Sequence, residues 1–153
     1  RTQSPAAQAL ERLGELVGDW EGTLADGRTH RVNYRWSAGN AVLVETWTLG
    51  PDRESLTIYH RDGEALLATH YCPQFTHPRL RLVEQEGDRL SFAFVDGANL
   101  DDPERHHQHS FWIRFVDADT FERSETYVAN GASAGEIASA KAEPATVFKR
   151  MAK

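Results

Sequence analysis

Three pairs of strand-like segments, each pair joined by a tight turn, constrain the fold of this chain more than any other feature of its sequence. The first pair, "ESLTIYHRDGEALLATHYC", turns at Asp62-Gly63, which is a strong hairpin signal. The second pair turns at Glu86–Asp88 and the third at Asp117–Asp119. Consecutive hairpins predict an antiparallel meander, and a long meander tends to close because closure removes its exposed edges. We therefore predict an all-β fold, a single antiparallel meander barrel of about eight to ten strands.

A short helix is predicted before the first strand. In "SPAAQALERLGEL", Ser4 is a suitable N-cap and Pro5 suits the first helical position. We expect the helix to span residues 4–16 and to cover part of the barrel, because one of its faces is apolar. That apolar face consists of Leu10, Leu13 and Leu16.

The rest of the chain is predicted to form one domain. No linker, repeat or change of composition interrupts its 153 residues, so we assign residues 1–153 to a single domain with the barrel over 18–150. Segment 129–144 is rich in Ala, Gly and Ser and is predicted to be a loop or a poorly formed strand. The final segment, "ATVFKR", is predicted to be a short strand.

Charge and composition exclude some partners. The net charge of −6 and the pI near 5.6 argue against a nucleic-acid surface, which requires clustered Lys and Arg. No apolar run approaches the roughly 18 residues of a membrane span. Cys72 is the single cysteine, so no intrachain disulfide is possible. The first residues, "RTQSPAAQ", are typical of a chain from which a secretory signal has been removed, so we expect a periplasmic or secreted protein, with the cytoplasm as the alternative.

The segment "ELVGDWEGTL" resembles a signature of known barrel proteins. Its Gly18-Asp19-Trp20, placed after a helix and before a series of hairpins, resembles the Gly-x-Trp signature of lipocalins and fatty-acid-binding proteins, the calycin group. The resemblance implies that Trp20 packs across the barrel floor against a basic residue of the final strand. Of Lys149 and Arg150, we expect Arg150 to make this cation–π contact. Gly18, Trp20 and Arg150 are thus expected to have structural roles.

Two further segments resemble an uncharacterised bacterial lipocalin-like branch. They are "THYC" at Thr69–Cys72 and "HQHSFWIRFVDAD" at His107–Asp119. In that branch Asn-Gln-Pro-Arg follows the first segment, whereas this chain has Thr76-His77-Pro78-Arg79, which keeps only the Pro-Arg. The resemblance implies a fold and no particular activity, so function has to be argued from the residues of the site.

The segment "RHHQHSFWIRF" contains three of the seven histidines of the chain. Side chains alternate along a strand, so the odd positions from His107 to Phe115 form one face and Gln108, Ser110, Trp112 and Arg114 form the other. The odd face is the more apolar, and we expect it to direct His107 and His109 into the barrel or to its mouth. His106, His30, His60 and His77 are expected at the surface.

Another histidine, His70, lies in the predicted strand "LLATHYC". His70 and Cys72 share a face with Leu66 and Ala68, and the sequence does not decide whether this face points inward. If it does, His70, His107 and His109 could form a polar patch, the polar end of a ligand pocket, or a zinc or haem site. Glu45 and Glu125 are the carboxylates that other strands could add. Cys72 itself is expected to be structural.

Catalytic signatures are missing from the sequence. It contains no nucleophile elbow, phosphate loop, dinucleotide fingerprint or His-Glu-x-x-His, so an enzyme is not favoured. The Asp117–Asp119 segment is interpreted as a turn rather than a calcium loop.

The sequence favours a binding module that holds a small hydrophobic or amphipathic ligand inside the barrel. Two alternatives stay open: a metal- or haem-dependent protein that uses His70, His107 and His109, and a filled barrel that acts through its surface, as a homodimer for example. No cofactor is predicted by the favoured hypothesis. Its predicted ligand-binding residues are His70, His107, His109, Tyr34, Trp36, Trp47, Phe92, Phe111 and Ile113, with Leu43, Phe94 and Phe115 as further lining side chains.

Overall fold

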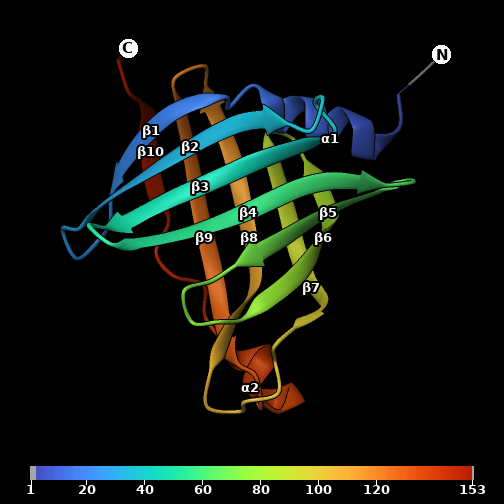
Figure 1. Ribbon diagram of the computed structural model, residues 1–153, viewed down its shortest axis with the longest axis vertical. Coiled ribbons are helices and arrows are strands. Elements are labelled where there is room, and N and C mark those ends of the chain that lie inside the picture. Colours follow the sequence, from blue (N-terminus) through green and yellow to red (C-terminus); the bar gives the residue numbers. More distant parts are fainter. Residues whose placement is uncertain (1–2, 153) are drawn as a thin grey trace.

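Ten antiparallel strands close into a barrel in the computed structural model, which describes residues 3–152 (Figure 1). Each strand pairs with the next one along the chain, and β1 pairs with β10 to close the sheet, so the predicted all-β meander barrel is confirmed. The elements are α1 (Pro5–Gly14), β1 (Gly18–Thr23), β2 (Thr29–Ser37), β3 (Val42–Gly50), β4 (Arg53–Asp62), β5 (Ala65–Tyr71), β6 (His77–Glu86), β7 (Arg89–Ala98), β8 (His106–Asp117), β9 (Thr120–Ala129), α2 (Ala134–Ser139) and β10 (Thr146–Arg150).

The tight turns lie where the sequence predicts them. Asp62 pairs with Ala65 across the β4–β5 turn, and Gly63 adopts a φ of +59°, which a residue with a side chain rarely tolerates. The β6–β7 and β8–β9 hairpins also turn at the predicted positions. Because these turns allow no crossover, strands that follow one another in sequence become neighbours in the sheet.

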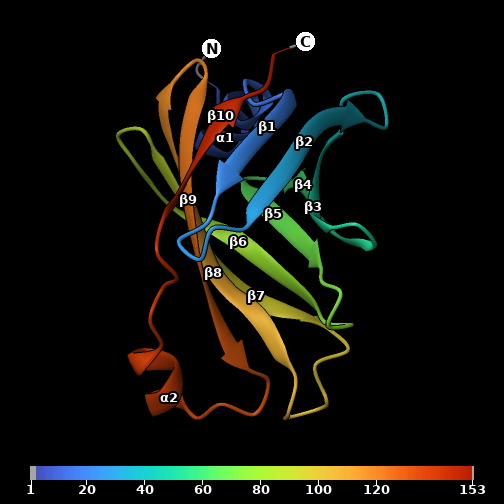
Figure 2. The same cartoon turned by 90° about the vertical axis from the view of Figure 1, so that its left-hand side faces the viewer.

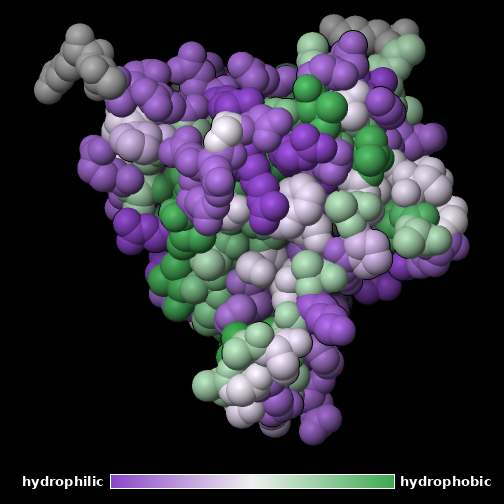
Figure 3. Space-filling model, turned by 180° about the vertical axis from the view of Figure 1, so that it is seen from behind, coloured by the Kyte–Doolittle hydropathy of each residue, from purple (hydrophilic) through white to green (hydrophobic). Residues whose placement is uncertain are grey.

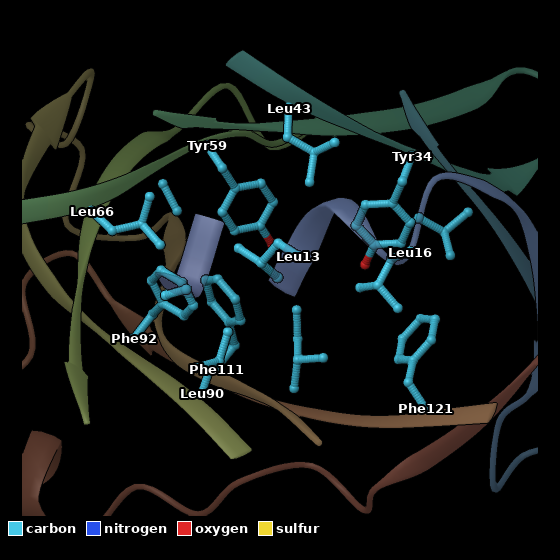
Figure 4. Packing of buried hydrophobic residues seen from close by; sticks show 14 of the residues in the cluster. Leu13, Leu16, Tyr34, Leu43, Tyr59, Leu66, Leu90, Phe92, Phe111 and Phe121 are labelled. Atoms are coloured by element: carbon cyan, nitrogen blue, oxygen red, sulfur yellow. The ribbon is translucent and has the colours of Figure 1, made fainter. Parts of the chain in front are cut away.

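Helix α1 covers one end of the barrel (Figure 1). The Ser4 side chain accepts a hydrogen bond of 3.2 Å from the Ala7 N–H, which caps the helix as predicted. The helix ends at Gly14 rather than at residue 16, because the chain tightens into turns there. Figure 4 shows the side chains of Leu13 and Leu16 directed into the barrel interior.

Aromatic side chains fill the barrel from α1 to its middle (Figure 4). Phe92 and Phe111 stack with their ring centroids 4.7 Å apart, and Tyr59 meets both rings edge-on. The favoured hypothesis places a ligand among these side chains, but this part of the interior is a packed core, because the side chains of Leu13 and Leu16 enter it from the covered end. Its predicted lining residues are core residues: Tyr34, Leu43, Phe92, Phe111, Ile113 and Phe115.

The contact between Trp20 and Arg150 closes the covered end. The Trp20 side chain is fully buried, and its Nε1 donates a hydrogen bond of 2.8 Å to the Leu16 carbonyl. The Arg150 guanidinium lies 4.3 Å from the centre of the indole ring and donates to the carbonyls of Glu15 and Val17. One pair of residues therefore joins β1, β10 and the segment that follows α1.

Gly18 leaves room for that arrangement. Its φ is +130°, and a Cβ at this position would approach Arg150 Nη1 to 2.9 Å. A side chain here would therefore be strained and would displace the guanidinium from the ring of Trp20.

The segment between β9 and β10 differs from its prediction as a loop or strand. It contains the short helix α2, which lies at the end of the molecule away from α1 (Figure 2). The reason is a capping box, in which Ser133 Oγ accepts from the Glu136 N–H and the Glu136 carboxylate accepts from the Ser133 N–H. Neither helix of the described chain is long and apolar enough to cross a membrane.

We expect Trp20→Ala to lower the free energy of unfolding by about 3–5 kcal/mol, because it removes a buried indole and the surface on which Arg150 rests. Urea unfolding measures this change. Trp112→Ala, in which the lost ring is only partly buried, is the control and should cost much less. A midpoint for Trp20→Ala equal to that of the wild type would show that the contact does not stabilise the barrel.

Candidate functional site

A cavity of about 390 Å³ lies at the end of the barrel away from α1. It is bordered by the ends of β3, β5 and β9 and the starts of β2, β4, β8 and β10. Its apolar wall includes Trp47, Leu49 and Phe148, and its polar wall combines charged and hydrogen-bonding side chains. That polar wall includes His30, His70, Arg123, Glu125, Tyr127 and Glu143.

A buried ion pair forms part of the polar wall. Arg123 and Glu125 alternate on β9 and face the same side, and Arg123 Nη1 donates to the Glu125 carboxylate. The guanidinium also lies 4.7 Å from the ring centre of Trp47 and 5.2 Å from that of Phe111.

Burial alone would lower the pKa of Arg123, but the carboxylates of Glu125 and Glu45 raise it. Burial alone would raise the pKa of Glu125, and Arg123 lowers it. Both groups therefore stay charged.

Glu45 is a second carboxylate, and it is completely buried. Its Oε2 accepts hydrogen bonds from the hydroxyls of Tyr34, at 2.8 Å, and Tyr59, at 2.6 Å, while its Oε1 accepts one of 2.6 Å from Trp47 Nε1. Burial, followed by the charge of Glu45, raises the pKa of both tyrosines, so both keep their protons and act as donors. Three donors on one carboxylate supply the hydrogen bonds that water would otherwise provide.

His70 faces the interior. The face of β5 that carries His70, whose direction the sequence did not decide, therefore points inward. It is buried with Leu66 and Ala68 and lines the cavity. Its Nδ1 lies 2.9 Å from Thr57 Oγ1, and its Nε2 lies 3.5 Å from the Tyr127 hydroxyl. Burial lowers the pKa of His70 from 6.5 to about 4, so its imidazole is neutral near neutral pH. Burial, followed by the charge of Glu125, raises the pKa of Tyr127.

The predicted alternation along β8 is interrupted. A bulge shifts the register between Gln108 and Ser110, because one extra residue of β8 stands opposite β9. Gln108 was predicted to face outward with Ser110, yet it is completely buried opposite Tyr127. His106 was predicted at the surface and is exposed, although it also borders the cavity mouth.

His107 and His109 form a separate cluster and do not line the cavity. His107 Nε2 lies 3.0 Å from His109 Nδ1, and His107 Nδ1 lies 2.8 Å from Asn130 Oδ1. The ring of Phe94 packs against both imidazoles at centroid distances of 4.6 and 5.1 Å. The two histidines thus satisfy each other at the β8–β9 end and lie apart from His70.

Of the predicted ligand-binding residues, the structure places His70 and Trp47 at the cavity. Tyr34, Phe92, Phe111 and Ile113 belong to the core. Trp36 lies in a surface groove beside α1. Within residues 3–152 no three His, Cys, Asp or Glu side chains are arranged to hold a metal ion.

Two site residues, Arg123 and Tyr127, were not predicted from the sequence, and Glu45 and Glu125 were named only as carboxylates that could join the histidines. The segment "FERSETY" places Phe121, Arg123, Glu125 and Tyr127 on one face of β9. Glu45 stands between Leu43 and Trp47 in the apolar run "AVLVETWTL". A charged residue at an inward position of a strand was the available signal in both cases.

Among solved structures, the chain resembles a protein of unknown function from the DUF3598 family of Nostoc punctiforme, with a TM-score of 0.56 and 12% sequence identity. The alignment covers 91% of this chain and 49% of that one, so this chain spans about half the length of its structural neighbour. No protein-family model matches the sequence, and no curated protein does. At this identity the likeness shows the fold alone, an antiparallel barrel shared with a protein whose function is unknown.

We expect Glu45→Ala to lower the free energy of unfolding by about 3–5 kcal/mol, because three buried donors lose their acceptor and Arg123 loses a nearby negative charge. Urea unfolding measures the change, with Glu54→Ala on the exposed start of β4 as the control. A cost of less than about 1 kcal/mol would contradict the role given to Glu45.

The buried His70 predicts a loss of stability in mild acid. Between pH 6.5 and about 4 the unfolded chain binds a proton at this side chain and the folded chain does not, so the free energy of unfolding falls as the pH falls. The contribution of His70 amounts to about 3 kcal/mol at pH 4. His70→Gln should lose this part of the pH dependence, as followed by urea unfolding at several pH values.

NMR titration of the folded protein gives a direct check on His70. Its ring should remain neutral until about pH 4, whereas an exposed histidine titrates near 6.5. A midpoint for His70 near 6.5 would contradict its burial.

Proposed function

We propose that the protein binds a small, partly hydrophobic molecule in the cavity at the end of the barrel away from α1. The observation that carries the proposal is the cavity itself, because its volume of about 390 Å³ is in the range of small-molecule sites. The bound molecule would lie between the apolar wall and the ion pair of Arg123 and Glu125.

Membership of the calycin group is part of this proposal. The closed meander barrel, the short helix before β1, and the stacking of Arg150 on Trp20 support it. Calycins hold their ligands inside the barrel, as the resemblance implies. The structural neighbour adds no ligand, because its own function is unknown.

The open end distinguishes this chain from a completely filled barrel. Side chains occupy the interior from α1 to the layer of Glu45, and the cavity begins beyond Trp47 and Arg123. A ligand is therefore proposed at the mouth end, in contact with His70 and Trp47, and not between the core aromatic residues.

The alternative of a domain that acts through its exterior stays open. Figure 3 shows apolar residues gathered on the left of the face opposite to that of Figure 1, with polar residues around them. The exposed apolar side chains include Phe75, Val83 on β6, Val95 on β7, Val116 on β8 and Val147 on β10. Export of the chain and a homodimer stay predictions.

Binding in the cavity can be tested with N-phenyl-1-naphthylamine, an uncharged dye that becomes fluorescent in apolar sites. We expect the wild type to bind it with a blue-shifted emission, and Thr146→Trp to weaken binding by about tenfold or more, because the new indole fills the cavity. Fluorescence titration measures both.

Val147→Trp is the matched control, since Val147 is the next residue of β10 and its side chain is exposed. This variant should bind the dye like the wild type. Failure of the wild type to bind the dye, or equal binding by Thr146→Trp at unchanged stability, would overturn the proposal.

A further inference from the structure

We infer that the cavity selects ligands whose polar group is uncharged and carries an oxygen that accepts hydrogen bonds, such as an amide, a ketone or an alcohol. This inference rests on the proposed function. The charges that already lie in the polar wall decide which ligand groups the wall accepts and which it rejects.

Arg123, a buried cation of the polar wall, is already compensated. Arg123 donates to Glu125, and the second carboxylate, Glu45, lies behind Trp47. The carboxylates of both Glu125 and Glu45 raise the pKa of Arg123. The guanidinium is therefore paired before a ligand arrives, and the part of the chain that the structure describes leaves no unpaired buried cation in the inner wall for an anionic ligand.

A carboxylate ligand would meet repulsion at this position. It would have to approach Arg123 beside Glu125, and like charges in a poorly solvated site disfavour each other strongly. Glu143 already experiences this field, because burial and then the charge of Glu125 raise its pKa. The arginines of the cavity rim do not replace Arg123: Arg28 and Arg53 are exposed to solvent, and Arg28 is paired with Asp26 at 2.7 Å.

An ammonium ligand cannot satisfy the open donor of the wall. Arg123 Nε is buried and has no hydrogen-bond partner among residues 3–152. An N–H group such as Arg123 Nε needs an acceptor, and an ammonium has only donors. It would also place a second cation beside the guanidinium.

An uncharged oxygen fits these groups. It can accept from Arg123 Nε without adding a charge to the pair of Arg123 and Glu125. His70 and Tyr127, which also line the wall, are neutral as well, because burial keeps the proton off His70 and on Tyr127. A neutral ligand also loses less hydration free energy than an ion when it enters the cavity.

Four probes with the same carbon skeleton test the inference: 3-phenylpropanamide, 3-phenylpropan-1-ol, 3-phenylpropanoate and 3-phenylpropan-1-amine. Displacement of the bound dye at about pH 7.5, where the last two are ionised, gives their affinities. We expect the dissociation constants of the amide and the alcohol to be lower than those of both ions by about tenfold or more. Equal affinities, or tightest binding by the carboxylate or the amine, would overturn the inference.

Failure of this inference is distinguishable from failure of the proposed function. If the dye binds and is lost in Thr146→Trp, but none of the four probes displaces it, the inference is overturned and the proposed function stands. If the wild type binds neither the dye nor the probes, the proposed function is overturned together with the inference.

A variant that frees Arg123 provides a second test. Glu125→Gln leaves the guanidinium without its direct counter-charge, so the variant should bind 3-phenylpropanoate about tenfold more tightly than the wild type does, with a much smaller change for the amide. Glu122→Gln is the matched control. Glu122 also lies on β9 and pairs with an arginine, Arg114, but it does not line the cavity. If the folded Glu125→Gln protein binds 3-phenylpropanoate no more tightly than the wild type does, the inference is contradicted. If the variant does not fold, the four probes on the wild type test the inference alone.

Discussion

The rest of the interior depends on how the buried charges of Glu45 and Arg123 are satisfied. Glu45 holds the hydroxyls of Tyr34 and Tyr59, which belong to the packed core, and also the indole of Trp47, which walls the cavity. The guanidinium of Arg123 rests on that same indole. The two charged side chains therefore form the layer at which the filled part of the barrel ends and the cavity begins. A carboxylate at this depth is stable only while its donors stay in place, so the network fixes the rings on both sides of it.

Much of the fold could be predicted from local patterns. The turn at Asp62-Gly63, the alternation of β-branched and aromatic residues, and the N-cap at Ser4 each act over a few residues, and each has the predicted consequence in the structure. Helix α2 escaped prediction because its composition suggests a loop, and the capping box of Ser133 and Glu136 outweighs that preference at its first turn. How much of the interior is filled could not be predicted for a non-local reason, since the sequence does not reveal how deeply Leu13 and Leu16 enter the barrel.

The site was harder to predict than the fold because it depends on pairing between distant strands. Alternation along β8 is interrupted by a bulge between Gln108 and Ser110, and the residue types there do not indicate a bulge. Arg123 occupies what looks like an ordinary polar position of a strand until closure of the barrel places it on the ring of Trp47, which is far away in the sequence. His107 and His109 attracted the prediction because histidines are common at sites, whereas here they hydrogen-bond to each other. Buried charges were thus the better guide to this site than histidine spacing.

An internally paired arginine also changes what a ligand has to provide. In a cavity with an unpaired cation, the ligand must bring the counter-charge, and both ions lose their hydration when the complex forms. Here Glu125 compensates Arg123 before any ligand arrives, so that cost belongs to folding rather than to binding. Under the proposed function, a ligand would have to accept one directional hydrogen bond and to cover the apolar wall formed by Trp47, Leu49 and Phe148. Such a site gains its selectivity from the donors that it leaves open and from the charges that it has already neutralised.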